Sequence, residues 1–166
     1  MNLLLLATIV FASMLFETAM SRRNERELRA MGAAEPHDDV YWLMQIAYPA
    51  AFIAMLVEGW RRGAIVDVHV AAGFALLVGA KLLKYWVIMS LGVRWTFRVL
   101  VPPGSTRVLT GPYRLLSHPN YLAVMGELAG AALIAHAPLT GGIALAGFGV
   151  LILLRIRVEE RALGMR

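Results

Sequence analysis

The sequence has 166 residues, of which 59% are apolar, and its formal net charge is +5. This length suits one domain, and the apolar fraction exceeds the roughly 45–50% usual in soluble globular proteins, so a single soluble core would not bury it. The absence of cysteine excludes disulfides, thiol nucleophiles and thiolate metal sites. Because the basic residues border apolar blocks and do not cluster with exposed aromatic residues, we expect no nucleic-acid partner and no metal.

The apolar residues fall into five blocks that approach the length of a membrane helix. A helix needs about 20 such residues to cross a hydrocarbon core. We therefore expect an all-α, polytopic membrane helix bundle of about five transmembrane helices, forming one integral membrane domain over residues 1–166. The first block lacks a preceding basic stretch and a following cleavage pattern, so we expect a retained helix and not a signal peptide. The blocks are residues 2–20, 40–60, 64–93, 121–137 and 139–154.

The domain divides into three N-terminal spans, residues 1–94, and a C-terminal part, residues 95–166, that holds a loop, a helical hairpin and a tail. The last two blocks have only 17 and 16 residues and are separated by little more than Pro138. At about 1.5 Å per residue each reaches about 25 Å, so the hairpin either crosses the membrane or stops short of its far side. The glycines of this hairpin, among them Gly126, Gly130 and Gly147, predict close helix packing.

Twelve arginines fall on one side of a chain with five spans, and only two fall on the other. By the positive-inside rule the side with twelve arginines is cytoplasmic and the N-terminus is outside. We therefore expect a protein of a bacterial or archaeal cytoplasmic membrane, with the loop after the third block facing the cytosol. The twelve are Arg22, Arg23, Arg26, Arg29, Arg94, Arg98, Arg107, Arg114, Arg155, Arg157, Arg161 and Arg166, and the two are Arg61 and Arg62.

Two polar features interrupt the N-terminal spans. Lys81 and Lys84 lie a turn apart within the third block. One interpretation is that the two ammonium groups bind a buried partner or face a water-filled cavity. The other is that the helix is tilted and both groups extend to the membrane interface beside Tyr85 and Trp86. The sequence leaves both interpretations open. The charged connection 21–39 predicts a short interfacial helix that begins with Ser21.

The segment "GPYRLLSHPNYL", residues 111–122, joins a cytosolic loop to the fourth block. Pro119 suits the first turn of a helix, so His118 lies at or beside its cap. His118 and Tyr121 are three residues apart and share a face at a helix end whose free N–H groups attract anions. A simple capping role is the alternative.

The segment "RIRVEERAL", residues 155–163, leaves the fifth block on the same side of the membrane. Arg155 lies four residues before Glu159, and Arg157 lies three residues before Glu160. This spacing is also typical of ordinary exposed salt bridges. The hairpin, however, brings these carboxylates next to the start of the fourth block. There they have the chemistry to hold the hydroxyls of a ribose or a sulfonium cation.

The two motifs together resemble the isoprenylcysteine carboxyl methyltransferase family, integral membrane enzymes that use S-adenosylmethionine. The N-terminal segments "SRRNERELRAMGA" and "YWVIMSLGVRWT" resemble a bacterial branch associated with type III polyketide synthases. The resemblance implies a cytosolic cofactor pocket in which Gly111, Pro112 and Tyr113 shape the loop, and in which His118, Tyr121, Glu159 and Glu160 bind S-adenosylmethionine. It also implies that Arg157 lies near the methyl-transfer point. The chain departs from the family at Ser117, where an arginine is usual.

The function expected is methylation of a lipophilic acceptor, either a small molecule or a prenylated substrate, that arrives from the surrounding membrane lipids. The resemblance favours O-methylation of a carboxylate; hydroxyl methylation of alkylpyrone or alkylresorcinol lipids is the alternative. Glu127, a carboxylate in apolar surroundings, is the candidate general base. His136, near the hairpin tip, is expected to be an interfacial residue. A non-enzymatic transporter or assembly subunit is the competing class.

Overall fold

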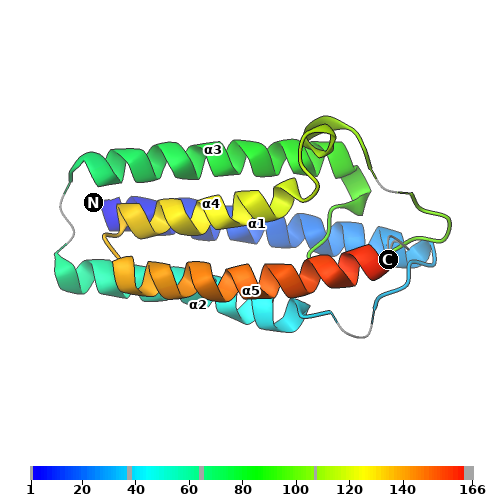
Figure 1. The fold of residues 1–166 in the computed structure, drawn as a ribbon, viewed down its shortest axis with the longest axis horizontal. Coiled ribbons are helices and arrows are strands. Elements are labelled where there is room, and N and C mark those ends of the chain that lie inside the picture. Colours follow the sequence, from blue (N-terminus) through cyan, green and yellow to red (C-terminus); the bar gives the residue numbers. More distant parts are fainter. Residues whose placement is uncertain (1, 37–38, 64–65, 107, 163–166) are drawn as a thin grey trace.

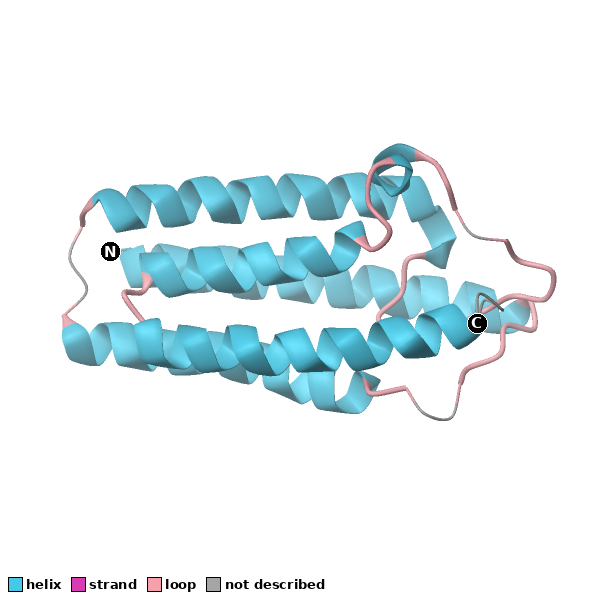
Figure 2. Ribbon diagram, viewed as in Figure 1, coloured by secondary structure: helices cyan, strands magenta, loops and turns pink. Residues whose placement is uncertain are grey.

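The computed structural model of the protein describes residues 2–36, 39–63, 66–106 and 108–162. Within these residues the fold is helical, as Figure 2 shows, and the one β-type pairing is an isolated bridge between Ala34 and Val101. The long helices lie roughly parallel or antiparallel in an elongated bundle (Figure 1). The elements are α1 (Asn2–Ala30), α2 (Tyr41–Arg62), α3 (Val68–Leu91), the 3-10 turns η1 (Gly92–Arg94) and η2 (Gly111–Arg114), α4 (Pro119–Ile134) and α5 (Pro138–Ala162).

The expectation of an all-α membrane bundle is confirmed. Four of the described helices, α1, α2, α3 and α5, are long and apolar enough to cross a membrane. The fifth, α4, has 16 residues, which corresponds to about 24 Å. In Figure 1 its Pro119 end stops short of the neighbouring ends of α3 and α5. The hairpin is therefore asymmetric, with a short first arm and a long second arm.

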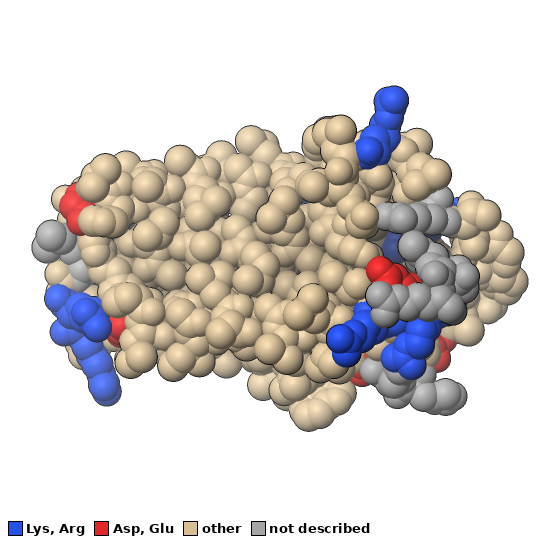
Figure 3. All heavy atoms as spheres, viewed as in Figure 1, with Lys and Arg blue, Asp and Glu red and all other residues tan. Residues whose placement is uncertain are grey.

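On the face drawn in Figure 3, charged side chains gather at the two ends of the bundle, and the surface between them shows none. The C-terminal ends of α1, α3 and α5 and the start of α4 lie at one end (Figure 1), which brings together the described arginines of the predicted cytoplasmic side. The connections between α2 and α3 and between α4 and α5 lie at the other end. We call the first the loop end and the second the hairpin end.

The predicted separate helix after residue 20 is wrong, because α1 continues without a break to Ala30. Ser21 does not cap a new helix. Its side chain is buried and accepts a hydrogen bond from the Phe97 N–H at 2.8 Å, while its hydroxyl donates to Glu25 at 2.7 Å. The first helix therefore projects past the apolar block and supports the segment that follows α3.

Close packing of α3 against α4 forms the centre of the bundle. A Cβ atom built on Gly130 would lie 2.9 Å from the Gly73 carbonyl oxygen and 2.9 Å from the Leu77 nitrogen. Both are backbone atoms, which side-chain rotation does not move. The predicted packing role of the hairpin glycines is thus confirmed at Gly130, whereas a Cβ at Gly147 would meet nothing within 4 Å.

Gly130→Ala should destabilise the bundle, since overpacking costs roughly 1–3 kcal/mol where the backbone must shift. The matched control is Gly147→Ala on α5. Thermal unfolding in detergent should show a lower melting temperature for Gly130→Ala alone. Equal melting of the two variants would contradict close α3–α4 packing.

Candidate active site

The start of α4 carries the first pair of predicted site residues. Pro119 occupies the first turn, and His118 precedes it as the N-cap residue, with φ −136° and ψ 63° and no capping hydrogen bond from its side chain. The alternative of a side-chain capping role for His118 is therefore wrong. Its imidazole stacks on the Tyr121 ring, with the two centroids 5.9 Å apart.

The end of α5 carries the second pair. The Tyr121 hydroxyl donates a hydrogen bond to the Glu159 carboxylate. The two ring nitrogens of His118 lie 3.7 Å from carboxylate oxygens of Glu159 and Glu160, respectively. The hairpin thus brings together four residues that are up to 42 positions apart, as the two sequence motifs predict. Their contact is a structural fact, whereas their role toward a cofactor stays a prediction.

A cavity of about 180 Å³ lies beside these four residues, between them and the segment that follows α3. We call it the loop pocket. Its wall is basic at one edge, where Arg94 lies, and acidic at the α5 edge. The Ser105 hydroxyl oxygen is buried without a hydrogen-bond partner. The polar side chains in its lining include Arg94, Ser105, Tyr113, Ser117, His118, Glu159 and Glu160.

A second cavity of about 440 Å³ extends into the bundle from Tyr121 and Glu159. We call it the helix pocket. Its wall is largely apolar and includes Leu15 of α1, which is 73% exposed on the outer surface of the bundle. The two pockets share five lining residues, which we call the junction: Trp95, Thr96, Asn120, Tyr121 and Glu159.

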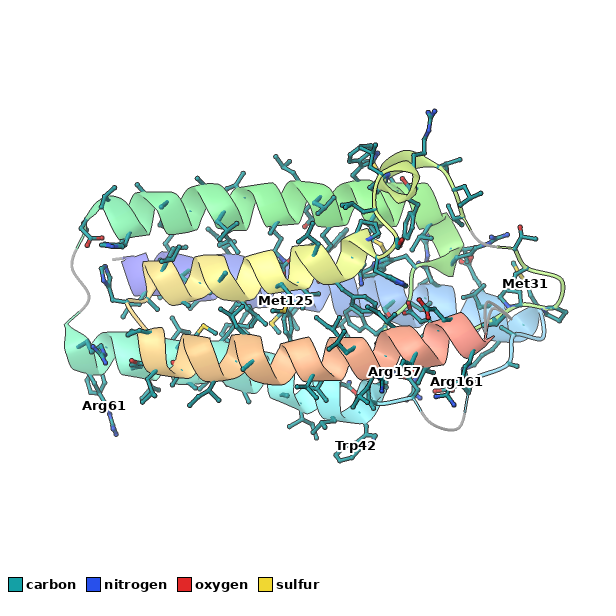
Figure 4. The ribbon with its side chains drawn as sticks, in the orientation of Figure 1. Met31, Trp42, Arg61, Met125, Arg157 and Arg161 are labelled. Carbon is teal, nitrogen blue, oxygen red and sulfur yellow. The ribbon has the colours of Figure 1, made fainter. Side chains whose placement is uncertain are left out.

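The buried arginine beside the junction is Arg155 and not Arg157. Arg155 is 5% exposed and binds the Asp39 carboxylate at 3.1 Å, the Phe97 carbonyl oxygen and, at 3.7 Å, Glu159. Two residues further along a helix lie about 200° around it. Arg157 is accordingly exposed on the outer side of α5, away from α4 (Figure 4). Arg157 lines neither pocket among the residues described, and its expected place near the methyl-transfer point stays a prediction.

Of the predicted loop residues, only Tyr113 lines the loop pocket. Gly111 has a φ of 58° and packs so closely on α3 that a Cβ would lie 2.0 Å from the Ser90 hydroxyl oxygen. Pro112 is buried. These two residues therefore fix the loop to α3, and they shape the pocket indirectly.

Glu127 is not the isolated carboxylate that its proposed role as a base assumed. It is 2% exposed, its carboxylate lies 2.8 Å from the Lys84 nitrogen, and it accepts a hydrogen bond from the Tyr48 hydroxyl. It lines neither pocket among the residues described. The structure also decides between the two readings of the lysines, because Lys81 and Lys84 both bind buried carboxylates and neither reaches the interface.

Sequence reasoning missed several residues that build this region. Glu17, the lone acidic residue of the first apolar block, pairs with both lysines, and its isolation there was the available signal. The Asn24 amide donates to the Trp95 carbonyl oxygen at 2.8 Å. Although partial burial opposes the effect, hydrogen bonds from Arg98 and Arg29 lower the pKa of Glu35. No sequence pattern indicates the long-range contacts of Asn24 and Glu35.

His136 lies at the C-terminal end of α4, at the hairpin end, with Tyr121 at the opposite end of the same helix. Its φ is 50°, and its ring lies 3.3 Å from Asp67, which also binds His69. It therefore belongs to a separate polar cluster and takes no part in the junction.

These features define an integral membrane protein in which a polar pocket at the helix ends opens onto an apolar pocket within the bundle. The sequence profile of the isoprenylcysteine carboxyl methyltransferase (ICMT) family matches residues 72–165, more than half of the chain. The chain belongs to this family and is a membrane methyltransferase in this broad sense.

Two relatives cover nearly the whole chain. An uncharacterized protein named YpbQ from Bacillus subtilis is 29% identical over 159 residues, 96% of this chain and 95% of its own. An uncharacterized protein from Haemophilus influenzae is 27% identical over 165 residues, 96% of each chain. No solved structure gives a significant match. Neither relative's name states an activity, so the narrower resemblance to a polyketide-associated branch is not borne out.

Replacing Arg155 should destabilise the protein far more than replacing Arg157. Arg155→Gln leaves the buried Asp39 carboxylate without its cation, a loss of roughly 3–5 kcal/mol for a buried pair, whereas an exposed substitution usually changes stability by less than about 0.5 kcal/mol. Melting temperatures of Arg155→Gln and Arg157→Gln in detergent test this. The prediction fails if Arg157→Gln is the less stable variant.

Proposed function

We propose that the protein transfers a methyl group from S-adenosylmethionine to an oxygen of a lipophilic acceptor. The observation that carries this proposal is the shared junction: a pocket with both basic and acidic edges meets an apolar pocket at Tyr121 and Glu159. A soluble zwitterionic cofactor suits the first pocket, and a lipid suits the second. The loop end then faces the cytosol, in agreement with its arginines.

The side chains of the loop pocket match the polar groups of the cofactor. Glu159 and Glu160 accept hydrogen bonds from ribose hydroxyls and favour a nearby sulfonium. Arg94 and the unpartnered Ser105 hydroxyl at the other edge suit the carboxylate of the methionine part. Arg94 would thereby supply the cation that the family usually has at the position of Ser117.

When bound, S-adenosylmethionine supplies a methyl group on an already activated sulfonium. Transfer is an in-line displacement, so alignment and exclusion of water account for most of the barrier reduction. The acceptor oxygen would form its bond to the methyl carbon with its own electron pair, and the pair of the broken carbon–sulfur bond would stay on sulfur. Tyr121 and Asn120 line the junction where this alignment must occur.

The acceptor in this proposal is a carboxylate, as in the isoprenylcysteine methyltransferases, and such an acceptor needs no base. The alternative is a hydroxyl of an alkylpyrone or alkylresorcinol lipid, whose proton must be removed. Glu159 lines both pockets, which supports it, in place of Glu127, as the candidate to take that proton. Base treatment of a radiolabelled product distinguishes a labile ester from a stable ether.

The intact protein in detergent should bind S-adenosylmethionine in a calorimetric titration, and His118→Ala and Glu159→Ala should weaken that binding. Each change removes a group whose charge or hydrogen bond is worth roughly 1.5–3 kcal/mol, or about tenfold or more in affinity. Absence of binding in the folded wild-type protein would support the non-enzymatic class instead.

Arg94→Gln should weaken binding of S-adenosylmethionine roughly tenfold and leave binding of methylthioadenosine, which lacks the amino-acid part, unchanged. Arg114→Gln, an exposed arginine outside the described pocket lining, is the matched control. Equal losses for both ligands would show that Arg94 acts through the loop, where it donates to the Thr106 carbonyl oxygen at 3.0 Å, and not through the carboxylate.

A further inference from the structure

Four ionisable side chains from three helices meet in the middle of the bundle. The Lys84 nitrogen lies 3.2 Å from Glu17 and 2.8 Å from Glu127, and the Lys81 nitrogen lies 2.8 Å from Glu17 and 3.2 Å from Glu127. We call these residues the ion cluster. Two ammonium and two carboxylate groups give the cluster no net charge. Such groups are costly within a membrane and usually serve a function there.

One side of the ion cluster forms part of the wall of the helix pocket. Glu17 and Lys84 line the pocket, whereas Lys81 and Glu127 do not among the residues described. Tyr48, whose hydroxyl binds Glu127 and whose ring lies 5.6 Å from the Lys84 nitrogen, lines it too. Together with Thr18 and Gln45 these residues form a polar wall, in addition to the polar residues at and beside the junction, in a pocket that is largely apolar elsewhere.

The Lys84 nitrogen and the Tyr48 hydroxyl of the polar wall both contact the Glu127 carboxylate, so this part of the wall lies at about the depth of Glu127. On α4, Glu127 follows Tyr121 by six residues, which corresponds to about 9 Å along the helix axis. An acceptor with its reacting oxygen at the junction therefore passes the polar wall about 9 Å further into the bundle.

The ion cluster joins α1, α3 and α4, but this role does not by itself explain why ionisable groups line the helix pocket. A buried ion pair is often no more stabilising than well-packed apolar residues of similar volume. A purely hydrocarbon acceptor would also bring methylene groups against an ammonium and a carboxylate, and buried polar groups without matching partners are costly. The wall suits a ligand that offers hydrogen bonds at this depth.

We propose that the helix pocket selects acceptors carrying an uncharged hydrogen-bonding group, such as a hydroxyl or carbonyl, about 9 Å from the methylated oxygen, and that Glu17, Lys84 and Tyr48 receive this group. A charged group is disfavoured, because the ion cluster is already neutral and an additional buried charge would have no counterion. This inference rests on the proposed function, in that it places the reacting oxygen at the junction.

A positional series of fatty acids tests the proposal without methyl transfer. The probes are hexadecanoic acid and its isomers hydroxylated beside the carboxyl group, near mid-chain and at the far end, titrated calorimetrically into the full-length protein in nanodiscs, with empty nanodiscs as the blank. The mid-chain isomer should bind roughly tenfold more tightly than the others, as expected for a hydrogen bond to a charged group. Equal affinities across the series would overturn the proposal.

Three variants separate recognition from stability. Lys84→Met and Tyr48→Phe should abolish the preference for the mid-chain isomer. Lys81→Met removes one ammonium from the same cluster without changing the described pocket wall, and should keep the preference even where it lowers the melting temperature. Tyr48→Phe keeps the test valid if Lys84→Met does not fold. Retention of the preference in Tyr48→Phe and Lys84→Met, or its loss in Lys81→Met, contradicts the assignment. Binding of S-adenosylmethionine is measured separately. Its absence would contradict the proposed function but not the preference for the mid-chain isomer.

Discussion

A charged side chain inside a hydrocarbon layer must have a partner of opposite charge, and this constraint organises the protein. Glu17 and Glu127 both bind Lys84 and thereby join α1, α3 and α4 at mid-bundle. Nearer the loop end, Arg155 and Asp39 form a second buried pair that joins α5 to the segment before α2. Because each pair is buried, separating either set of helices would leave uncompensated charges.

The buried ion pairs also help to position the segments that border the loop pocket and the helix pocket. Arg155 also binds the Phe97 carbonyl oxygen, which holds the segment after α3 beside the start of α4. The short α4 allows this segment to cover its Pro119 end. The loop pocket and the helix pocket consequently meet at residues from both arms of the hairpin. Under the proposed function, this arrangement would bring a soluble cofactor and a lipophilic acceptor together.

Much of this fold was predictable, because apolar block length decides which segments form helices in a membrane. The pairing of His118 and Tyr121 with the carboxylates near the end of α5 was also predictable, since a short hairpin brings its two ends together. The choice between Arg155 and Arg157 was not, because it depends on the rotation of α5 against Asp39 and Phe97, and both contacts come from distant segments. The partners of Lys81 and Lys84 stayed open for the same reason: Glu17 is more than 60 residues away in the chain.

The most direct measurement is an experimental structure of the protein with S-adenosylhomocysteine bound in a lipid environment. The ligand should occupy the loop pocket with its sulfur at the junction, beside Tyr121 and Asn120 and facing the helix pocket, and with its carboxylate toward Arg94. A ligand bound at the hairpin end, or one whose sulfur is separated from the helix pocket by the side chains of the junction, would contradict the claim that the two pockets meet where the methyl group is transferred.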